Sequence, residues 1–150
     1  MAQWSSSNWT NGDEYACSGT PFVTGSHGVV DLNNSDVRKI VFPRVTRWIA
    51  IYNHNTNAAH SMKVGFSANG LAAKGDHVNG TGDAEAHYIF VPGNKETGRL
   101  EVRCTELYLL AGSANRVNFT VVAGLTNIPP TNMFQMTGSI DGTSHILGVG

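Results

Sequence analysis

The chain has 150 residues, which is enough for one domain with a hydrophobic core of its own. Its formal net charge is −1, from 10 basic and 11 acidic residues, so no basic surface for nucleic acid is indicated. Only 14% of the residues are charged, against roughly a quarter in typical domains. This low charge fits either a surface covered by neighbouring subunits or a loop-rich β protein with a neutral polar surface.

Membrane and secretory segments are not expected. No apolar run approaches the roughly 20 residues of a membrane helix, and the first residues have neither the basic nor the apolar part of a secretory signal. We therefore expect no direct membrane insertion and free thiols at Cys17 and Cys104 in a reducing compartment. The glycosylation sequons are expected to be chance matches; they start at Asn8, Asn33, Asn79 and Asn118.

The first 20 residues contain Trp4, Trp9 and Tyr15 among small polar residues, without periodicity. This pattern predicts an extended N-terminal arm over residues 1–20, ordered by what it lies against. Residues 21–150 are predicted to form a single domain. Aromatic side chains are frequent interface anchors, so Trp4 and Trp9 are candidates for contact with another subunit.

Short strands separated by turn residues are predicted through the first half of the domain. In the strand over residues 45 to 53, both faces of the second half are apolar or aromatic. This indicates a central strand or an outer face that meets another subunit, which makes Trp48 and Tyr52 interface candidates. The predicted strands cover residues 22–23, 29–32, 37–42, 45–53, 62–66 and 88–91.

A long segment over residues 69 to 86 is rich in Gly, Ala, Asn and Asp and has no apolar period. Loops of this length in compact domains are often functional, so we expect an exposed loop at one end of the fold. Its candidate exposed residues are Asn69, Asp76, Asn79 and Asp83.

Residues 97 to 130 are the predicted hydrophobic centre of the domain. Leu100, Val102 and Cys104 alternate with charged residues, which predicts a strand with one buried face. The phase slips near residues 105 to 106, where we expect a bulge or corner. Two further strands are predicted over residues 107–111 and 117–125. About eight to ten short strands without a long helix predict an all-β fold, a single antiparallel jelly-roll β-sandwich; an immunoglobulin-like sandwich is the second choice.

No motif in the sequence points to catalysis. No two of the six histidines are two apart, as a cupin-type metal site would need. Asp76, Asn79, Asp83 and Glu85 could ligate calcium, but their spacing does not match the helix-flanked calcium loop. Nucleophile-elbow, Walker and dinucleotide motifs are missing from the sequence. We therefore predict no catalytic residue, no metal and no cofactor.

Several segments resemble the single jelly-roll vertex (penton) proteins of nucleocytoplasmic large DNA viruses, the chlorella-virus type in particular. The similar segments are residues 47–53, 64–67, 97–104 and 121–129, within a resemblance that spans about residues 20 to 130. The resemblance implies a homopentamer at each icosahedral fivefold axis, in contact with neighbouring major and minor capsid proteins. It also implies a virion protein that is assembled in the host cytoplasm.

Three functions remain as hypotheses: a structural capsid protein, a carbohydrate-binding lectin-like β-sandwich of the kind that could be found at a virion surface, and a small β-fold hydrolase. The second would use Trp4, Trp9 and Trp48 as a platform on which sugars stack. We favour the interpretation that these tryptophans pack in a core or an interface. The structural function is the leading hypothesis, and an enzyme is the weakest.

Overall fold

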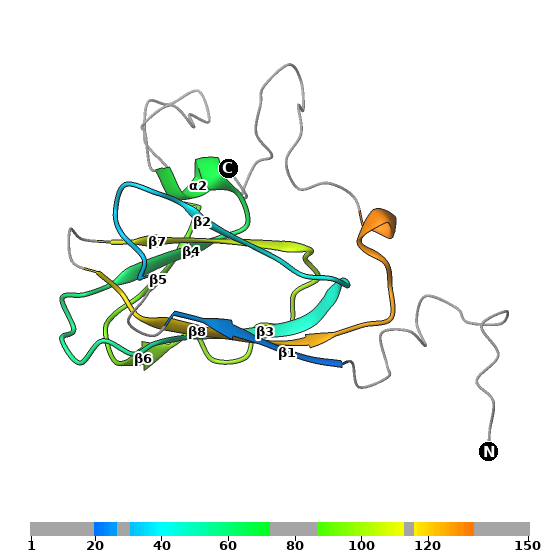
Figure 1. Ribbon diagram of the computed structural model, residues 1–150, viewed down its shortest axis with the longest axis horizontal. Helices are drawn as coiled ribbons and strands as arrows, with labels where there is room; N and C mark the ends of the chain where they lie inside the picture. Colours follow the sequence, from blue (N-terminus) through cyan, green and yellow to red (C-terminus); the bar gives the residue numbers. More distant parts are fainter. Residues whose placement is uncertain (1–19, 27–30, 73–86, 113–115, 134–150) are drawn as a thin grey trace, which may run out of the picture.

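The computed structural model describes residues 20–26, 31–72, 87–112 and 116–133. These residues form two four-stranded antiparallel sheets packed face to face (Figure 1), which confirms the predicted all-β antiparallel sandwich. Trp4, Trp9 and Cys17 lie outside the described residues, as does nearly all of the predicted arm.

One sheet, here the first sheet, has the strand order β1-β8-β3-β6, and the second sheet has the order β2-β7-β4-β5. Two short helical elements accompany them, α2 (Ala68–Ala72) and the 3-10 turn η1 (Pro130–Asn132). The strands are β1 (Thr20–Gly25), β2 (Arg38–Val41), β3 (Thr46–Asn53), β4 (Met62–Gly65), β5 (Ile89–Val91), β6 (Lys95–Glu96), β7 (Glu106–Ala111) and β8 (Phe119–Leu125).

The strand pairs follow a simple rule. The first strand pairs with the eighth, the second with the seventh, the third with the sixth and the fourth with the fifth. All of these pairs are antiparallel, and successive pairs alternate between the two sheets. The pairs β3–β8 and β4–β7 then complete each sheet. The described chain therefore doubles back on itself as one long antiparallel hairpin wrapped around the core.

The core lies between the two sheets. It is formed by the side chains that the period-two alternation of apolar residues predicts to face inward. The alternation in the sequence predicts that nine side chains face the core: Ile49, Ile51, Val64, Phe66, Leu100, Val102, Cys104, Phe119 and Val121. Ile49, Ile51, Val64, Phe119 and Val121 are at most 1% exposed, which confirms their assignment. Cys104 belongs to the same buried cluster, and Phe66, Leu100 and Val102 pack against it while partly buried.

The prediction of a strand over residues 99 to 104 is wrong. The predicted alternation is confirmed, because Arg99, Glu101 and Arg103 are exposed while Leu100, Val102 and Cys104 are partly or fully buried. The only ladder contact of this segment is an isolated bridge in which Leu100 and Ile49 exchange hydrogen bonds of 2.8 and 2.9 Å. The side chain of Thr46 explains the interruption. Its Oγ1 donates to the Val102 carbonyl at 2.8 Å and accepts from the Cys104 backbone N–H at 2.9 Å. A hydroxyl therefore occupies backbone groups that a neighbouring strand would otherwise pair.

The predicted long loop over residues 69 to 86 begins inside a helix, which corrects the placement of Asn69. The Ser67 Oγ accepts a hydrogen bond from the Gly70 N–H at 2.9 Å, and Leu71 is fully buried against Tyr108 and Leu110. A capped turn with a buried leucine therefore stabilises α2, which covers part of the outer face of the second sheet (Figure 1). The other loop candidates, Asp76, Asn79 and Asp83, lie outside the described residues.

The strand predicted over residues 29 to 32 is not found at residues 31 and 32, which are the part of it that the structure describes. Leu32 forms only an isolated bridge to Val117 and belongs to no strand. Residues 29 and 30 lie outside the described residues.

Candidate functional site

Asparagine side chains fix the loops at one end of the sandwich. Asn53, which is 3% exposed, donates from Nδ2 to the carbonyls of His60 and Val91, at 2.8 and 3.2 Å. Its Oδ1 accepts a hydrogen bond from the Asn55 N–H at 3.1 Å. One buried amide therefore joins the end of β3, the β3–β4 loop and the end of β5.

Asn55 extends this network to the beginning of β8. Its Nδ2 donates to the Arg116 carbonyl at 2.7 Å, and its Oδ1 accepts from the Asn118 N–H at 3.1 Å. Loop backbone needs partners for its polar groups, and these asparagines supply them. The run Asn53-His54-Asn55-Thr56-Asn57, predicted only as a loop, thus builds a fixed surface.

The turn between β5 and β6 packs closely on the same loop. A β-carbon placed on Gly93 would lie 2.0 Å from the Asn57 carbonyl oxygen, so only glycine fits there. The next residue, Asn94, has a φ of 58°, a left-handed conformation that asparagine tolerates better than most residues. This tight turn places β6 beside β3 at the edge of the first sheet.

A shallow, open pocket of about 360 Å³ lies beside this turn, on the outer face of the first sheet. The rings of Tyr52 and His54 are parallel within 9°, with centroids 6.4 Å apart. The His54 Nε2 lies 2.8 Å from the Thr120 Oγ1, and a hydrogen bond to the Glu96 carboxylate raises the pKa of Tyr52 above its ordinary value. The pocket is lined by Tyr52, Asn53, His54, Asn94, Lys95 and Glu96.

The predicted site residues are only partly brought together. Tyr52 lines the pocket and is 37% exposed, whereas Trp48 does not line it. The indole of Trp48 is half-buried on the outer face of the first sheet, with the Arg99 guanidinium 5.0 Å from its ring centroid. His54, Asn94 and Glu96 were missed because they come from a loop, a turn and a separate edge strand.

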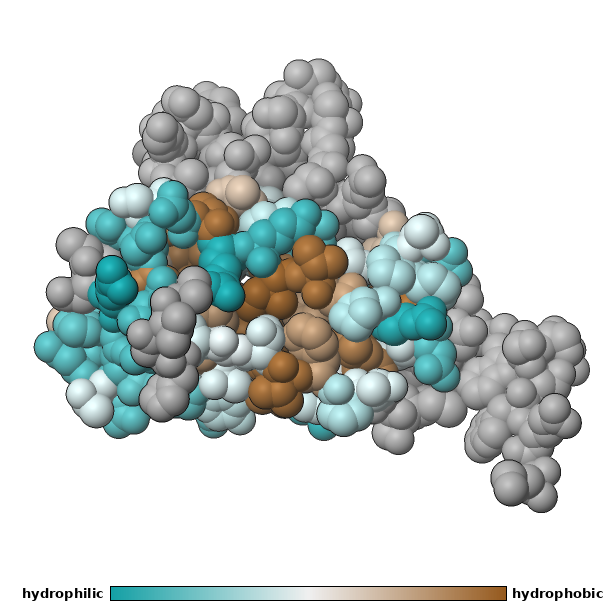
Figure 2. All heavy atoms as spheres, in the orientation of Figure 1, coloured by the Kyte–Doolittle hydropathy of each residue, from teal (hydrophilic) through white to brown (hydrophobic). Residues whose placement is uncertain are grey.

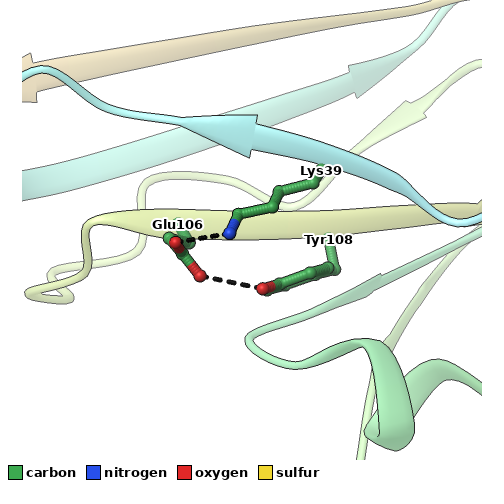
Figure 3. A network of polar contacts seen from close by, with 3 residues as sticks. All are labelled: Lys39, Glu106 and Tyr108. Atoms are coloured by element: carbon green, nitrogen blue, oxygen red, sulfur yellow. Dashed lines mark hydrogen bonds and ion pairs between the residues drawn. The ribbon is translucent and has the colours of Figure 1, made fainter. Parts of the chain in front are cut away.

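A second polar cluster lies on the outer face of the second sheet, where Lys39, Glu106 and Tyr108 meet (Figure 3). The Lys39 Nζ is 2.6 Å from the Glu106 Oε1, and the Tyr108 hydroxyl donates to the Glu106 Oε2 at 2.8 Å. The bond from Lys39 lowers the pKa of Glu106, and the same bond raises the pKa of Lys39. A carboxylate held ionised in this way is a poor general acid. We therefore interpret the cluster as a structural contact between β2 and β7.

Cys104 is a free, buried thiol, as predicted. Burial raises the pKa of Cys104 to about 11, which leaves little thiolate at neutral pH. Within residues 20–26, 31–72, 87–112 and 116–133, no three His, Cys, Asp or Glu side chains come together as a metal site would require. The same ranges hold no helix whose length and apolar character would let it span a membrane.

Comparison of the chain with family models, with curated proteins and with solved structures finds no match.

Proposed function

We propose that this protein is a structural capsid subunit that forms the pentameric vertex ring of an icosahedral virion. The observation that carries the proposal is the pairing of β1 with β8, β2 with β7, β3 with β6 and β4 with β5. We interpret this wrapped hairpin as a jelly roll, an architecture used by viral capsid and lectin domains. The pairing supports a jelly-roll protein, and the edges of the sheets favour the capsid subunit over the lectin.

Exposed apolar side chains lie at the sheet edges. Val23 in β1 is 65% exposed, Val41 in β2 is 59% exposed and Phe90 in β5 is 57% exposed. These are edge strands of the two sheets. Proteins that stay monomeric usually protect such edges with charge, proline or a covering element. The exposed apolar side chains therefore favour edges that are covered by other subunits.

The apolar side chains form two different flanks. Figure 2 shows hydrophobic side chains gathered between β1 and β2, where Phe22 and Phe42 meet edge to face with ring centroids 5.2 Å apart. We call this side, with Val23 and Val41, the β1/β2 flank. The opposite side, with Phe90 on β5, is the β5/β6 flank. The two flanks are unlike, because one gathers several apolar side chains and the other has Phe90 beside the charged β6. Unlike flanks suit a head-to-tail contact, and such a contact closes into a ring when the rotation allows it.

The β5/β6 flank of one copy then meets the β1/β2 flank of the next. In a virion, the remaining surfaces of this ring would contact the neighbouring major and minor capsid proteins. The low charge of the chain agrees with a surface that is largely covered in this way.

Flank variants test the head-to-tail contact. Val41→Asp and Phe90→Asp should each break the ring, because each places a charge in every interface, whereas Thr56→Asp in the exposed β3–β4 loop should leave it intact. Mixing the Val41→Asp and Phe90→Asp proteins restores one intact interface per pair, so native mass spectrometry should show a one-to-one dimer and no ring. If Phe90→Asp assembles as well as the wild type, the β5/β6 flank is not an interface.

The virion role is tested by locating the protein in purified particles with gold-labelled antibody or cryo-electron microscopy. The proposal predicts density for this chain at the fivefold vertices. Its absence from particles would refute the capsid function even if the isolated protein forms rings.

A further inference from the structure

We propose that the pocket beside Tyr52 and His54 binds a neutral pyranose sugar. Most small-molecule pockets are lined mainly by apolar side chains. This one combines the rings of Tyr52 and His54 with the carboxamide of Asn94, the ammonium of Lys95 and the carboxylate of Glu96. A fitting ligand has an apolar face that packs on a ring and a rim of hydroxyls that exchange hydrogen bonds, which describes a pyranose.

The charge of the lining and the volume of the pocket limit the class of ligand further. Lys95 and Glu96 are adjacent and of opposite sign, so the lining supplies both donors and acceptors without a net charge that would select an anion or a cation. The volume of about 360 Å³ is at the lower end of the roughly 300–1,000 Å³ of ligand pockets. One or two sugar rings match this space better than a long chain.

The pocket is also held in place before any ligand arrives. The hydrogen bond between His54 and Thr120 fixes the imidazole. The asparagine network behind it fixes the loop backbone through Asn53. Less side-chain and loop ordering is then required on binding, which favours affinity for a small ligand.

Every residue of the pocket comes from a single copy of the chain. Lys95 and Glu96 belong to β6, so the pocket borders the β5/β6 flank that the proposed ring covers, and sugar binding is a property of the unassembled chain. The inference differs from the tryptophan platform considered from the sequence, since Trp48 does not line the pocket.

The test is a titration of the full-length protein carrying Val41→Asp, which keeps the chain unassembled and leaves the pocket unchanged, with the methyl glycosides of glucose, galactose, mannose and N-acetylglucosamine, followed by NMR. At least one glycoside should shift the resonances of Tyr52, His54 and the residues 94 to 96 in a saturable manner. Tyr52→Ala, which removes a ring face, should weaken that binding by about tenfold or more. Tyr52→Phe keeps the ring face and should retain most of the affinity, and Phe90→Asp, outside the pocket, should leave it unchanged.

Three results would overturn the inference. The first is that none of the four glycosides perturbs these resonances. The second is that a glycoside binds Tyr52→Ala in this background, shown to be folded by its amide spectrum, as tightly as it binds Val41→Asp alone. The third is that an anionic sialoside binds more tightly than all four neutral sugars, which would assign the pocket to a different ligand class.

Discussion

The indole of Trp48 lies against the backbone of Gly124, its cross-strand partner in the β3–β8 pair. A β-carbon built on Gly124 would lie 2.3 Å from the Trp48 Nε1 and 2.8 Å from its Cε2. Only glycine at position 124 leaves room for the Trp48 indole to lie on the sheet. This contact explains how a large aromatic residue stays half-buried on an outer sheet face without entering the core.

Gly124→Ala should destabilise the protein by about 1–3 kcal/mol, because the indole must leave its place on the sheet. Urea denaturation followed by circular dichroism measures the change. In a Trp48→Ala background the same substitution should be neutral or slightly stabilising, since alanine restricts the unfolded chain. If Gly124→Ala lowered the free energy of unfolding equally in both backgrounds, the Trp48 indole would not be what excludes a side chain at position 124.

Asn53→Ala should cost about 1–3 kcal/mol, because it leaves the carbonyls of His60 and Val91 without their donor. Asn53→Asp should cost more, since it points a carboxylate at two carbonyl oxygens in a buried position. The control is Asn57→Ala, an exposed residue whose Oδ1 accepts from the Ala59 N–H at 3.0 Å, with an expected cost below about 1 kcal/mol. Equal unfolding free energies for the Asn53 and Asn57 variants would contradict the role given to Asn53.

The Lys39–Glu106 pair should stabilise the protein only within a pH window. The pKa of Glu106 is lowered from 4.5, so its contribution is present above that value and is lost as the pH falls through the lower, folded pKa. The pKa of Lys39 is raised from 10.5, so its contribution is present below that value and is lost as the pH rises through the higher one.

A double-mutant cycle with Lys39→Met and Glu106→Gln checks this window. Both side chains are a third or more exposed, so the coupling at neutral pH should be only about 0.2–1 kcal/mol. It should vanish near about pH 2 and shrink at high salt. A coupling that persists in acid would mean that the pair is not held by the ionised carboxylate.

Cys104 should be inert in the folded protein. With a pKa of about 11 and almost no exposure, its thiol should react with a disulfide reagent only as fast as the protein unfolds. The measurement uses Cys17→Ser, so that the signal comes from one thiol, with and without denaturant. Rapid modification in the native state would place Cys104 at the surface.

The sequence predicts the sandwich well and its details less well, for physical reasons. Alternation along one strand is a local property, so the inward faces at Ile49 and Phe119 could be predicted directly. The missing strand at residues 99 to 104 could not, because the hydroxyl that binds the Val102 carbonyl belongs to Thr46, 56 residues away along the chain.

The pocket illustrates the same limit. The sequence singles out Tyr52 because both faces of the second half of its strand are apolar or aromatic, whereas His54 and Asn94 look like ordinary loop residues. They meet only because Asn53 and the close contact of Gly93 with Asn57 join two loops. Such contacts follow from strand pairing across the whole chain and leave no periodic signal.

The mass of the full-length protein in solution tests the central claim most directly. Native mass spectrometry across a range of concentrations should show a closed species of five times the 16.0 kDa chain mass, with no larger open series. A monomer at every concentration, or a symmetric dimer that does not grow, would contradict assembly through two unlike flanks.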